Sequence, residues 1–376
     1  MSERIAGGVV TLTKIPVRRP HRMAIGTTFH QENVLLRFRT ESGREGFGEA
    51  PHMVGVSLKG ESPATVMVML KDRLLPAVRG LDVLDLERIQ QAMEKAVPWN
   101  YRAKSAVNMA VLDLAGQVLG VPAGVLLGGR VREAIPLSWS IPITDTAAGV
   151  EEAEQRVAQG WRILKLKLGR PNPKDDVEMV RALREALGTE IRLRADANQA
   201  YDVKTAIRVA HALERYDLEF FEQPVVWWDL DGLAEVSRAT ELAIMADESA
   251  TTIFGAVEVI RRRAAQAFSI YVSASGGLLN AKKMADLGAA HGISGYIGGA
   301  LEGPLGVAAG LHVAAAAPSV TLGCELYGQF LLEEDVAVTP IPFRDGALAV
   351  PTAPGLGVAL DQDRLRHYSL DTYEVS

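Results

Sequence analysis

The stretch LRADANQAYDVKTAIRVAHALERYDLEFFEQP, residues 193–224, decides the fold, because it reads as a strand, a helix and a second strand in succession. The first strand-like run ends at Asp196 and the second at Glu222, and the next run along the chain, MADES, carries Asp247. Separations of 26 and 25 residues between these acids fit one strand, one helix and two loops. Neighbouring parallel strands would bring the three carboxylates to one rim. Three oxygen ligands in one place predict a hard divalent cation, Mg²⁺ or Mn²⁺.

Further strand-like runs on both sides of this stretch extend the pattern to eight. Helix-like segments, such as residues 146–160 and 278–292, separate the first seven runs and lead into the eighth. This alternation predicts parallel strands, and eight of them predict a closed (β/α) barrel over residues 135–325. The runs are IPLSWSI (135–141), ILKLKLG (163–169), IRLRADA (191–197), LEFFEQP (218–224), LAIMADE (242–248), FSIYVSAS (268–275), ISGYIGG (293–299) and VTLGCEL (320–326).

The chain on either side of the barrel region has a different pattern, which indicates a second domain. Residues 1–134 combine strand-like runs with later helices, so we expect an α+β capping domain there. Residues 18–32 predict a long loop, of a length that is often functional. Residues 326–376 lack the alternation and are expected to return to the capping domain. The predicted fold class is therefore α/β, a modified (β/α) TIM-type barrel with an N-terminal α+β capping domain.

The composition indicates a soluble protein of the cytoplasm. The chain has 376 residues, 48% of them hydrophobic and 23% charged, as in ordinary globular proteins. A net charge of −6 without a basic stripe argues against a nucleic-acid partner. No apolar run is long enough for a membrane span, so no membrane partner is expected. The single cysteine, Cys324, excludes an intrachain disulfide and fits a reducing compartment.

Two lysines at the end of the second barrel strand are the candidate acid/base groups. Lys165 and Lys167 alternate along the strand and therefore point to the same face. Two neighbouring ammonium groups repel each other, which is expected to lower a lysine pKa towards the range of a general base. The alternative is a pair of lysines that only extend along a strand edge. Beside a metal-bound carboxylate, such a lysine could add or remove a proton at the α-carbon.

Two further polar residues follow the predicted metal ligands along the chain. Asn198 and Glu248 are expected to orient the ligands around the metal, with a surface or helix-capping role as the alternative. For the three acids themselves, helix capping and loop salt bridges are the alternatives. Their matching positions at the ends of three successive strands favour the metal site.

The whole chain resembles the muconate lactonizing branch of the enolase superfamily, and within it most resembles the muconate cycloisomerases. The matching stretches extend from residue 18 to about residue 362. They are RRPHRMA (18–24), GFGEA (46–50), AKSAVNMAVLDLAG (103–116), LLGGRVRE (126–133), LKLKLG (164–169), DANQ (196–199), EQP (222–224), MADES (245–249), GGALEGPLG (298–306), CELYGQFLLEE (324–334) and APGLGVALD (353–361).

This resemblance implies a capping domain over a modified barrel and assigns roles to the residues above. The metal would be held by Asp196, Glu222 and Asp247. Lys167 would be the acid/base, and Lys165 would lower its pKa and steer the substrate carboxylate. Glu302 matches a glutamate of the family site. The capping loops are expected to choose a small carboxylate substrate, and a homo-oligomer, such as an octamer, is also implied. The capping-loop candidates are His21, Met23, Ile25, Met53 and Val54.

One departure from the family pattern narrows the reaction. The family normally has a second acid/base lysine at the end of the sixth strand, where this chain has Ala274 in YVSASGG, and Tyr271 replaces another lysine. A racemase or epimerase must handle a proton on both faces of the substrate, so that class is disfavoured. Cycloisomerisation of a muconate-like dicarboxylate, with Lys167 as the proton donor, needs only one face. The alternatives are a one-sided syn-dehydratase, such as an o-succinylbenzoate synthase-like or acid-sugar enzyme, and a non-catalytic relative that binds a carboxylate and a metal.

Overall fold

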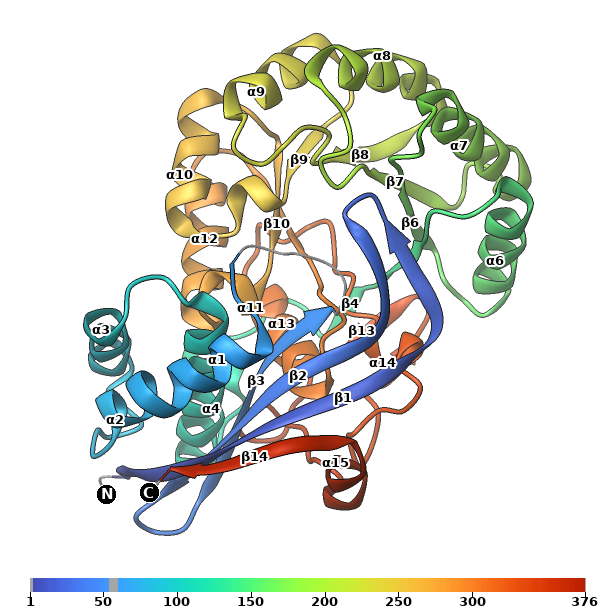
Figure 1. The fold of residues 1–376 in the computed structure, drawn as a ribbon. Coiled ribbons are helices and arrows are strands. Elements are labelled where there is room, and N and C mark those ends of the chain that lie inside the picture. The colour runs from blue at the N-terminus through green and yellow to red at the C-terminus, as the bar shows by residue number, and fades with distance from the viewer. Residues whose placement is uncertain (1–2, 54–59, 376) are drawn as a thin grey trace.

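The computed structural model describes residues 3–53 and 60–375 and contains a parallel barrel beside an antiparallel sheet (Figure 1). The barrel sheet has seven strands in the order β11-β10-β9-β8-β7-β6-β5, all paired in parallel. This sheet confirms the predicted (β/α) barrel class. Its strands are β5 (Ser138–Ile141), β6 (Ile163–Lys167), β7 (Arg192–Asp196), β8 (Leu218–Glu222), β9 (Ile244–Ala246), β10 (Ala267–Ile270) and β11 (Ser294–Ile297).

The eighth run closes the barrel through bridges at one residue rather than as a regular strand. Cys324 forms parallel bridges to Leu137 on one side and to Ile297 on the other. The Ser138 amide donates to the Cys324 carbonyl at 2.8 Å, and the Glu325 amide donates to the Ile297 carbonyl at 3.0 Å. The first and seventh strands are therefore joined, and Glu325 is held at the same rim as the ends of the other strands.

Helices cover the outside of the barrel, and most of them present an apolar stripe to the sheet, whereas α13 is buried on all sides. Several begin at a side-chain cap that satisfies a free helical amide, such as Asp145 for α6, Asp202 for α8 and Thr252 for α10. The helices are α6 (Thr146–Ala158), α7 (Pro173–Leu187), α8 (Val203–Leu213), α9 (Leu230–Ala239), α10 (Ile253–Arg262), α11 (Val272–Ser275), α12 (Leu278–Ala290) and α13 (Pro304–Ala316), with short 3-10 turns η2 (Glu214–Tyr216) and η3 (Glu248–Ala250).

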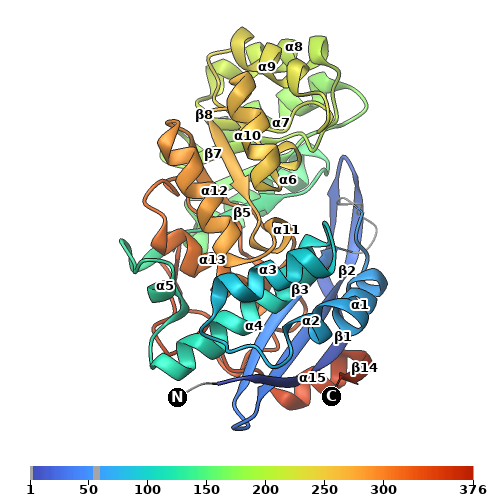
Figure 2. The same cartoon turned by 90° about the vertical axis from the view of Figure 1, so that its left-hand side faces the viewer.

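The antiparallel sheet has the order β14-β1-β2-β3 and carries helices on one face (Figure 2). β14 (Ser369–Val375) pairs with β1 (Ile5–Met23), so the C-terminal segment completes this sheet. The other strands are β2 (Gly26–Thr40) and β3 (Glu45–Met53), and the helices are α1 (Pro63–Met69), the π-helical turn η1 (Leu70–Leu74), α2 (Leu75–Val78), α3 (Leu86–Ala96), α4 (Tyr101–Leu119) and α5 (Ala123–Leu126).

Helix α4 joins the capping sheet to the barrel. It lies so close to β3 that a Cβ on Gly48 would come within 2.0 Å of the Ala106 carbonyl oxygen, so only glycine fits there. On its other side, the Ser105 hydroxyl donates to the Val272 carbonyl of α11 at 3.2 Å. Gly46 and Gly48 therefore allow close packing of β3 on α4, whereas Gly43 serves a turn. Helix α4 thus connects the two domains.

The prediction of a long loop over residues 18–32 is wrong. These residues extend β1 and β2 into a hairpin with a short turn, and His21 pairs with Thr28 and Met23 with Gly26. Within this hairpin the ladder is irregular between Pro16 and His21, where proline lacks the amide that a regular ladder needs. The hairpin projects over the barrel (Figure 1), and a Cβ on Gly169, after β6, would lie 2.6 Å from the Cβ of Ala24.

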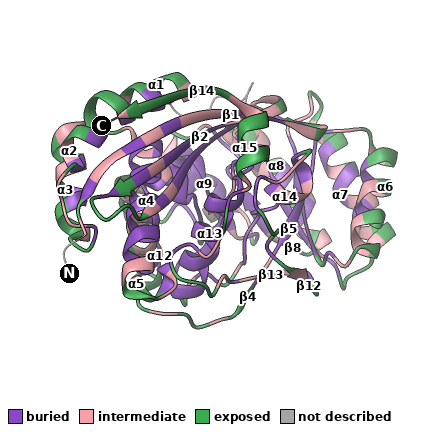
Figure 3. Ribbon diagram, turned by 90° about the horizontal axis from the view of Figure 1, so that it is seen from below, coloured by how far each residue is buried: buried purple, intermediate pink, exposed green. Residues whose placement is uncertain are grey.

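The remaining elements cover the bottom of the barrel and the edge of the capping sheet. Buried residues concentrate inside the barrel and between the capping sheet and its helices (Figure 3). No helix in the described part of the chain is long and apolar enough to cross a membrane. The additional elements are a three-stranded sheet of β12 (Phe343–Arg344), β13 (Ala347–Ala349) and β4 (Ala134–Pro136), and the helices α14 (Gly328–Leu331) and α15 (Gln362–Tyr368).

Candidate active site

The three acids of the predicted metal site lie at the carboxyl ends of three adjacent barrel strands. Asp196 ends β7 and is paired in the ladder with Glu222, which ends β8, while Asp247 directly follows β9. All three side chains are buried. Buried carboxylates at one rim of a barrel require a cation or hydrogen-bond donors to offset their charge.

Both lysines of β6 point towards these acids. Lys165 Nζ lies 2.8 Å from Glu222 Oε2, 3.3 Å from Asp196 Oδ2 and 2.6 Å from Glu325 Oε2. Lys167 Nζ donates to Asp196 Oδ2 at 2.5 Å. The two ammonium groups and three carboxylates thus form one charged cluster across β6, β7, β8 and the eighth run.

The expectation that the paired lysines lower each other's pKa is wrong for this arrangement. Burial lowers the pKa of Lys165, but Glu222, Glu325 and Asp196 outweigh it, so its pKa lies well above the ordinary lysine value. Burial and Lys165 also lower the pKa of Lys167, but the contact with Asp196 raises it above the ordinary value. Lysine–carboxylate attraction is stronger here than lysine–lysine repulsion, because the carboxylates are nearer. Both lysines are therefore ammonium ions in this state.

Among the acids, burial and repulsion between carboxylates raise two of the three pKa values. Burial and the nearby Asp196 raise the pKa of Glu222 to about 8. Burial, Glu248 and Glu222 hold the pKa of Asp247 well above its ordinary value. Burial also raises the pKa of Asp196, but Lys167 and Lys165 more than offset it, so that pKa is lowered. A shared cation near these oxygens would relieve the repulsion that raises the first two values.

The oxygen-bearing side chains at this rim suit a hard divalent cation, although their oxygens do not converge on one point. Among residues 3–53 and 60–375, no three His, Cys, Asp or Glu side chains are already arranged to hold a metal ion. The lysine ammonium groups instead contact the carboxylates of Asp196 and Glu222. Two buried oxygens, Glu222 Oε1 and Asn198 Oδ1, have no hydrogen-bond partner in the described chain. Carboxylate and amide oxygens without partners at a negatively charged rim are suitable ligands for Mg²⁺ or Mn²⁺.

The two predicted orienting residues lie beside the acids. The Asn198 amide donates to Asp196 Oδ1 at 2.9 Å, and Asn198 Nδ2 donates to Glu248 Oε1 at 3.4 Å. The side chain of Gln223 accepts from the Asp247 amide at 3.0 Å and from the Ser249 amide at 3.1 Å. Gln223 was not predicted, although its place in the EQP run, next to Glu222, was a usable signal. These contacts hold the ends of β7, β8 and β9 in a fixed relation.

A small cavity beside Lys167 contains most of the predicted capping-loop residues. The β1–β2 hairpin supplies His21, Met23 and Ile25, and β3 supplies Met53; Val54 lies outside the described residues. Burial, Arg19 and the two lysines hold the pKa of His21 well below its ordinary value, so His21 is neutral. The cavity is lined by His21, Met23, Ile25, Met53, Lys167, Asn198, Tyr271, Gly299, Glu325 and Tyr327.

The structure places the two candidate glutamates of the late strands differently. Glu302 is buried behind the rim, where its carboxylate accepts from the Ala300 amide at 2.9 Å, and it is not among the residues that line the Lys167 cavity. Burial raises its pKa to about 7. Glu325, which the sequence reasoning did not select, lines that cavity and contacts Lys165. Its position in CELYG, at the end of the eighth run, was the signal that could have identified it.

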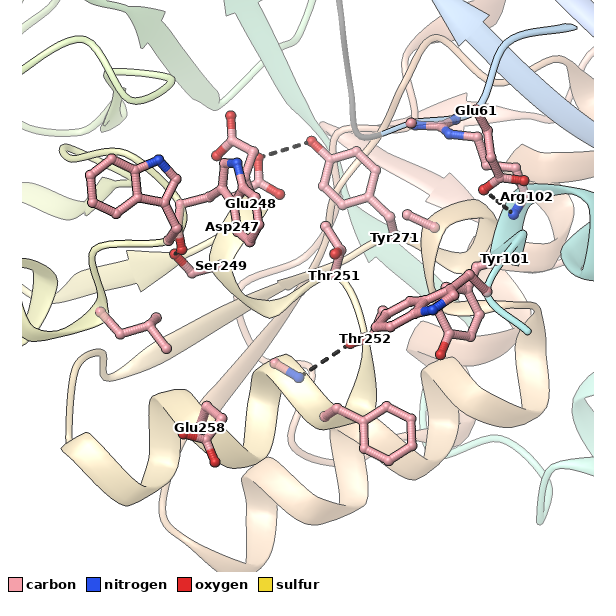
Figure 4. Close-up of a pocket in the computed structure, with 18 of the residues that line it drawn as sticks. Glu61, Tyr101, Arg102, Asp247, Glu248, Ser249, Thr251, Thr252, Glu258 and Tyr271 are labelled. Carbon is pink, nitrogen blue, oxygen red and sulfur yellow. Dashed lines mark hydrogen bonds between the residues drawn. The ribbon is translucent and has the colours of Figure 1, made fainter. Parts of the chain in front are cut away.

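The end of the sixth strand has no cation, as its sequence indicates. Tyr271 is buried, and its hydroxyl donates to Asp247 Oδ2 at 3.3 Å (Figure 4). Ala274 lies one turn further, in α11, and lines a larger pocket that also reaches Asp247 and Glu248. The face of the rim opposite Lys167 therefore presents a phenol and a methyl group.

Comparisons with known proteins give one consistent family. Residues 6–128 match the mandelate racemase / muconate lactonizing enzyme N-terminal domain, and residues 148–364 match the enolase C-terminal domain-like family. A chloromuconate cycloisomerase of Pseudomonas putida is 34% identical over 96% of this chain and 97% of its own.

Solved structures agree with this result. Muconate lactonizing enzyme from Pseudomonas fluorescens, complexed with muconolactone, superposes with a TM-score of 0.96 at 33% identity, over 98% of this chain and all of its own. The N-succinyl Arg/Lys racemase from Bacillus cereus superposes with a TM-score of 0.95 at 27% identity, over 99% of this chain and all of its own.

Proposed function

Because this chain belongs to the mandelate racemase / muconate lactonizing enzyme family of the enolase superfamily, we propose that it is a muconate cycloisomerase-like isomerase. Its reaction would be the ring closure of a cis,cis-muconate-like dicarboxylate to a lactone. The observation that supports this function best is the position of Lys167 in a cavity roofed by His21, Met23 and Ile25, beside the three rim acids.

Lys167 is proposed as the proton donor. One carboxylate of the substrate adds to the double bond, and the carbon next to the other carboxylate must then take up a proton. Lys167 carries an ammonium proton at Nζ, because Asp196 holds it in the charged form. Its side chain lines the cavity, so that proton is available to one face of a bound substrate.

Lys165 and Glu325 are proposed to position the charges around this step. Lys165 is fully buried between Glu222 and Glu325, so it is a fixed positive charge rather than a mobile donor. Such a charge attracts a substrate carboxylate and offsets negative charge that develops on it. The cavity wall formed by Met23, Ile25 and Met53 excludes water from the reacting carbon.

A divalent cation is part of the proposal, with Asp196, Glu222 and Asp247 as the residues that would hold it. When bound, Mg²⁺ or Mn²⁺ would act as a Lewis acid that stabilises negative charge on the substrate carboxylate. Asn198 and Glu248 would keep these carboxylates in place through the contacts described above. We propose that the active form is a homo-oligomer, which light scattering of the purified protein tests.

The function is tested by incubating the protein with cis,cis-muconate and Mn²⁺ in deuterated water. We expect a lactone of unchanged skeleton that contains one deuterium, placed on a single face. The syn-dehydratase alternative is tested separately with β-hydroxy carboxylic acids, from which that reaction would give a product lighter by one water. Absence of both a deuterated lactone and a dehydrated product at high enzyme concentration, across a panel of carboxylic acids, would leave only the metal- and carboxylate-binding relative.

A further inference from the structure

A large pocket adjoins the rim acids on the side opposite Lys167. Its volume is about 1020 Å³, which is at the upper end of small-molecule sites and exceeds what a six-carbon diacid fills. Asp247 and Tyr271 belong to its wall, and Tyr271 also belongs to the small Lys167 cavity. The pocket therefore borders Asp247, one of the acids proposed to hold the metal, and shares Tyr271 with the small cavity.

The outer wall of this pocket is unusually aromatic for an exposed surface. Trp99, Trp228 and Phe254 are each about two-thirds exposed, at 67%, 67% and 66%, and all three line the pocket. Trp99 packs edge-on against Tyr101, which is also part of the wall, with ring centroids 6.1 Å apart. Exposed aromatic rings gathered around a hollow mark a binding site for an apolar group.

Hydrogen bonds and a constrained backbone hold parts of the pocket wall in place. Gln199 Oε1 accepts from the Trp227 amide at 2.9 Å, and the Ser249 hydroxyl donates to the Trp227 carbonyl at 2.9 Å. Trp99 and Asn100 both adopt left-handed backbone, with φ of 59° and 51°. Non-glycine residues rarely take this conformation, and such strain concentrates at sites where a side chain must be held in a given place.

The inner end of the pocket is open because of the departure at the sixth strand. Ala274 contributes one methyl group at the position where the family has a long charged lysine. On one side are Asp247 and Glu248, and on the other is Arg102, whose backbone amide donates to Glu61 at 3.0 Å (Figure 4). A substituent that starts at the metal-site acids can therefore cross Ala274 and reach the aromatic wall without meeting a lysine at the end of the sixth strand.

We infer that this pocket binds a bulky aryl substituent of the substrate, so that the natural substrate is an aryl-bearing carboxylate rather than unsubstituted muconate. This inference rests on the proposed function for the position of the reacting carboxylate. Its independent support is the juxtaposition of Ala274 with the ring wall formed by Trp99, Trp228 and Phe254. The aryl group replaces water on rings that are exposed in the free protein, which favours binding.

The test compares two unreactive diacids that differ by one ring, succinate and phenylsuccinate, in the presence of Mg²⁺. Isothermal titration calorimetry should show phenylsuccinate binding at least about tenfold more tightly. Phe254→Ala and Ala274→Leu, which remove a wall ring and fill the inner end, should each reduce this ratio about threefold or more. Tyr373→Ala, which removes a partly exposed ring on β14 far from the pocket, should leave the ratio unchanged. Phenylsuccinate should also shift the fluorescence of the exposed tryptophans.

Equal affinities for the two diacids, unaffected by both pocket variants, would overturn the inference. Coverage of the aromatic wall by a second copy of the chain would also overturn it, and would appear as a Phe254→Ala variant of altered oligomeric state with no ring selectivity. Turnover of cis,cis-muconate, measured on the same preparation, reports the proposed function separately. Comparison of its kcat/KM with that of 3-phenyl-cis,cis-muconate then extends the binding result to the reaction.

Discussion

Lys165 Nζ lies 2.6 Å from Glu325 Oε2, and this contact links the second barrel strand to the eighth, which lie on the two sides of the first strand. The same ammonium group contacts Glu222 at 2.8 Å. Lys165 is therefore a fixed positive charge at the centre of the rim rather than a second general base. Its position explains why the charge state of both lysines differs from the expectation based on their spacing alone.

Replacement of Glu325 by Gln should lower kcat/KM about 10- to 100-fold, because it removes one of the groups that fix Lys165. Affinity for the metal should change by less than about threefold, since the three proposed ligands are untouched. Steady-state kinetics and a metal titration measure the two effects. Glu333→Gln, an exposed acid nearby in the chain, is the matched control and should behave as the wild type. A Glu325→Gln enzyme with full activity would contradict a positioning role.

Replacement of Lys167 by Ala should abolish product formation, with a loss of about 10²- to 10⁴-fold in kcat, because the proton donor is removed. Binding of the unreactive diacid succinate should persist within a few-fold, measured by calorimetry. Lys174→Ala, at an exposed position of α7, is the control for loss of a lysine. Residual activity close to the wild-type level would show that another group donates the proton.

Removal of divalent cations with a chelator should abolish activity, and Mg²⁺ or Mn²⁺ should restore it. The cation should also raise the melting temperature, because binding at about 100 times the dissociation constant stabilises a protein by about 2.7 kcal/mol. Asp247→Asn should weaken this thermal shift, whereas Asp286→Asn, an exposed acid of α12, should not. A thermal shift of equal size in both variants would place the cation elsewhere.

Wild-type protein should deliver deuterium to one face of the product carbon only, because the sixth strand offers Ala274 and no amine. Ala274→Lys adds an amine at this face and should allow exchange there. Nuclear magnetic resonance of the product distinguishes the two positions. Deuterium on both faces of the wild-type product would show that a second group transfers a proton. That group would not be among the described residues around Tyr271.

Stability should depend on pH through a buried acid that couples the two domains. Glu49 of β3 accepts from the Gly303 amide at 2.8 Å, and burial together with Glu302 raises its pKa to about 8 from an ordinary 4.5. The folded protein therefore keeps a proton at Glu49 that the unfolded chain releases, so the contribution of Glu49 to stability is largest at low pH and falls as pH rises from about 4.5 to 8.

The Glu49→Gln variant tests this dependence. Its free energy of unfolding should fall less steeply across that window, by up to about 1.4 kcal/mol per pH unit, because one titrating proton is removed. Denaturant unfolding at a series of pH values measures the slope, and Glu41→Gln, an exposed acid of the same domain, is the control. Parallel curves for Glu49→Gln and wild type would show that Glu49 is ionised throughout.

The barrel could be predicted from the sequence because its parallel strands are buried on both sides and appear as apolar runs at a constant spacing. The same spacing brought Asp196, Glu222 and Asp247 to one rim before any coordinates were considered. The hairpin over residues 18–32 could not be predicted, because the end of β1 alternates between inward and exposed positions while polar residues such as Arg19 and His21 occupy inward positions, so no apolar alternation marks the strand. Its polar residues, such as His21, face a site rather than solvent.

The charge state of the lysines could not be predicted either, because it depends on distances between side chains that are far apart in the chain. Glu325 and Lys165 are 160 positions apart, and only the closed barrel brings them together. Glu325 directly follows the bridge at Cys324, whereas Glu302 comes five residues after β11 ends, so the position of Glu325 at the rim was the more informative signal.

The pairing of β14 with β1 has a consequence for the order of assembly. Residues 369–375 leave the ribosome after the entire barrel, yet they complete the sheet whose hairpin covers the charged rim. During synthesis, one edge of β1 therefore remains unpaired until residues 369–375 have been made. A chain shortened before residue 369 would keep that edge, and copies of it would be prone to join through their own first strands.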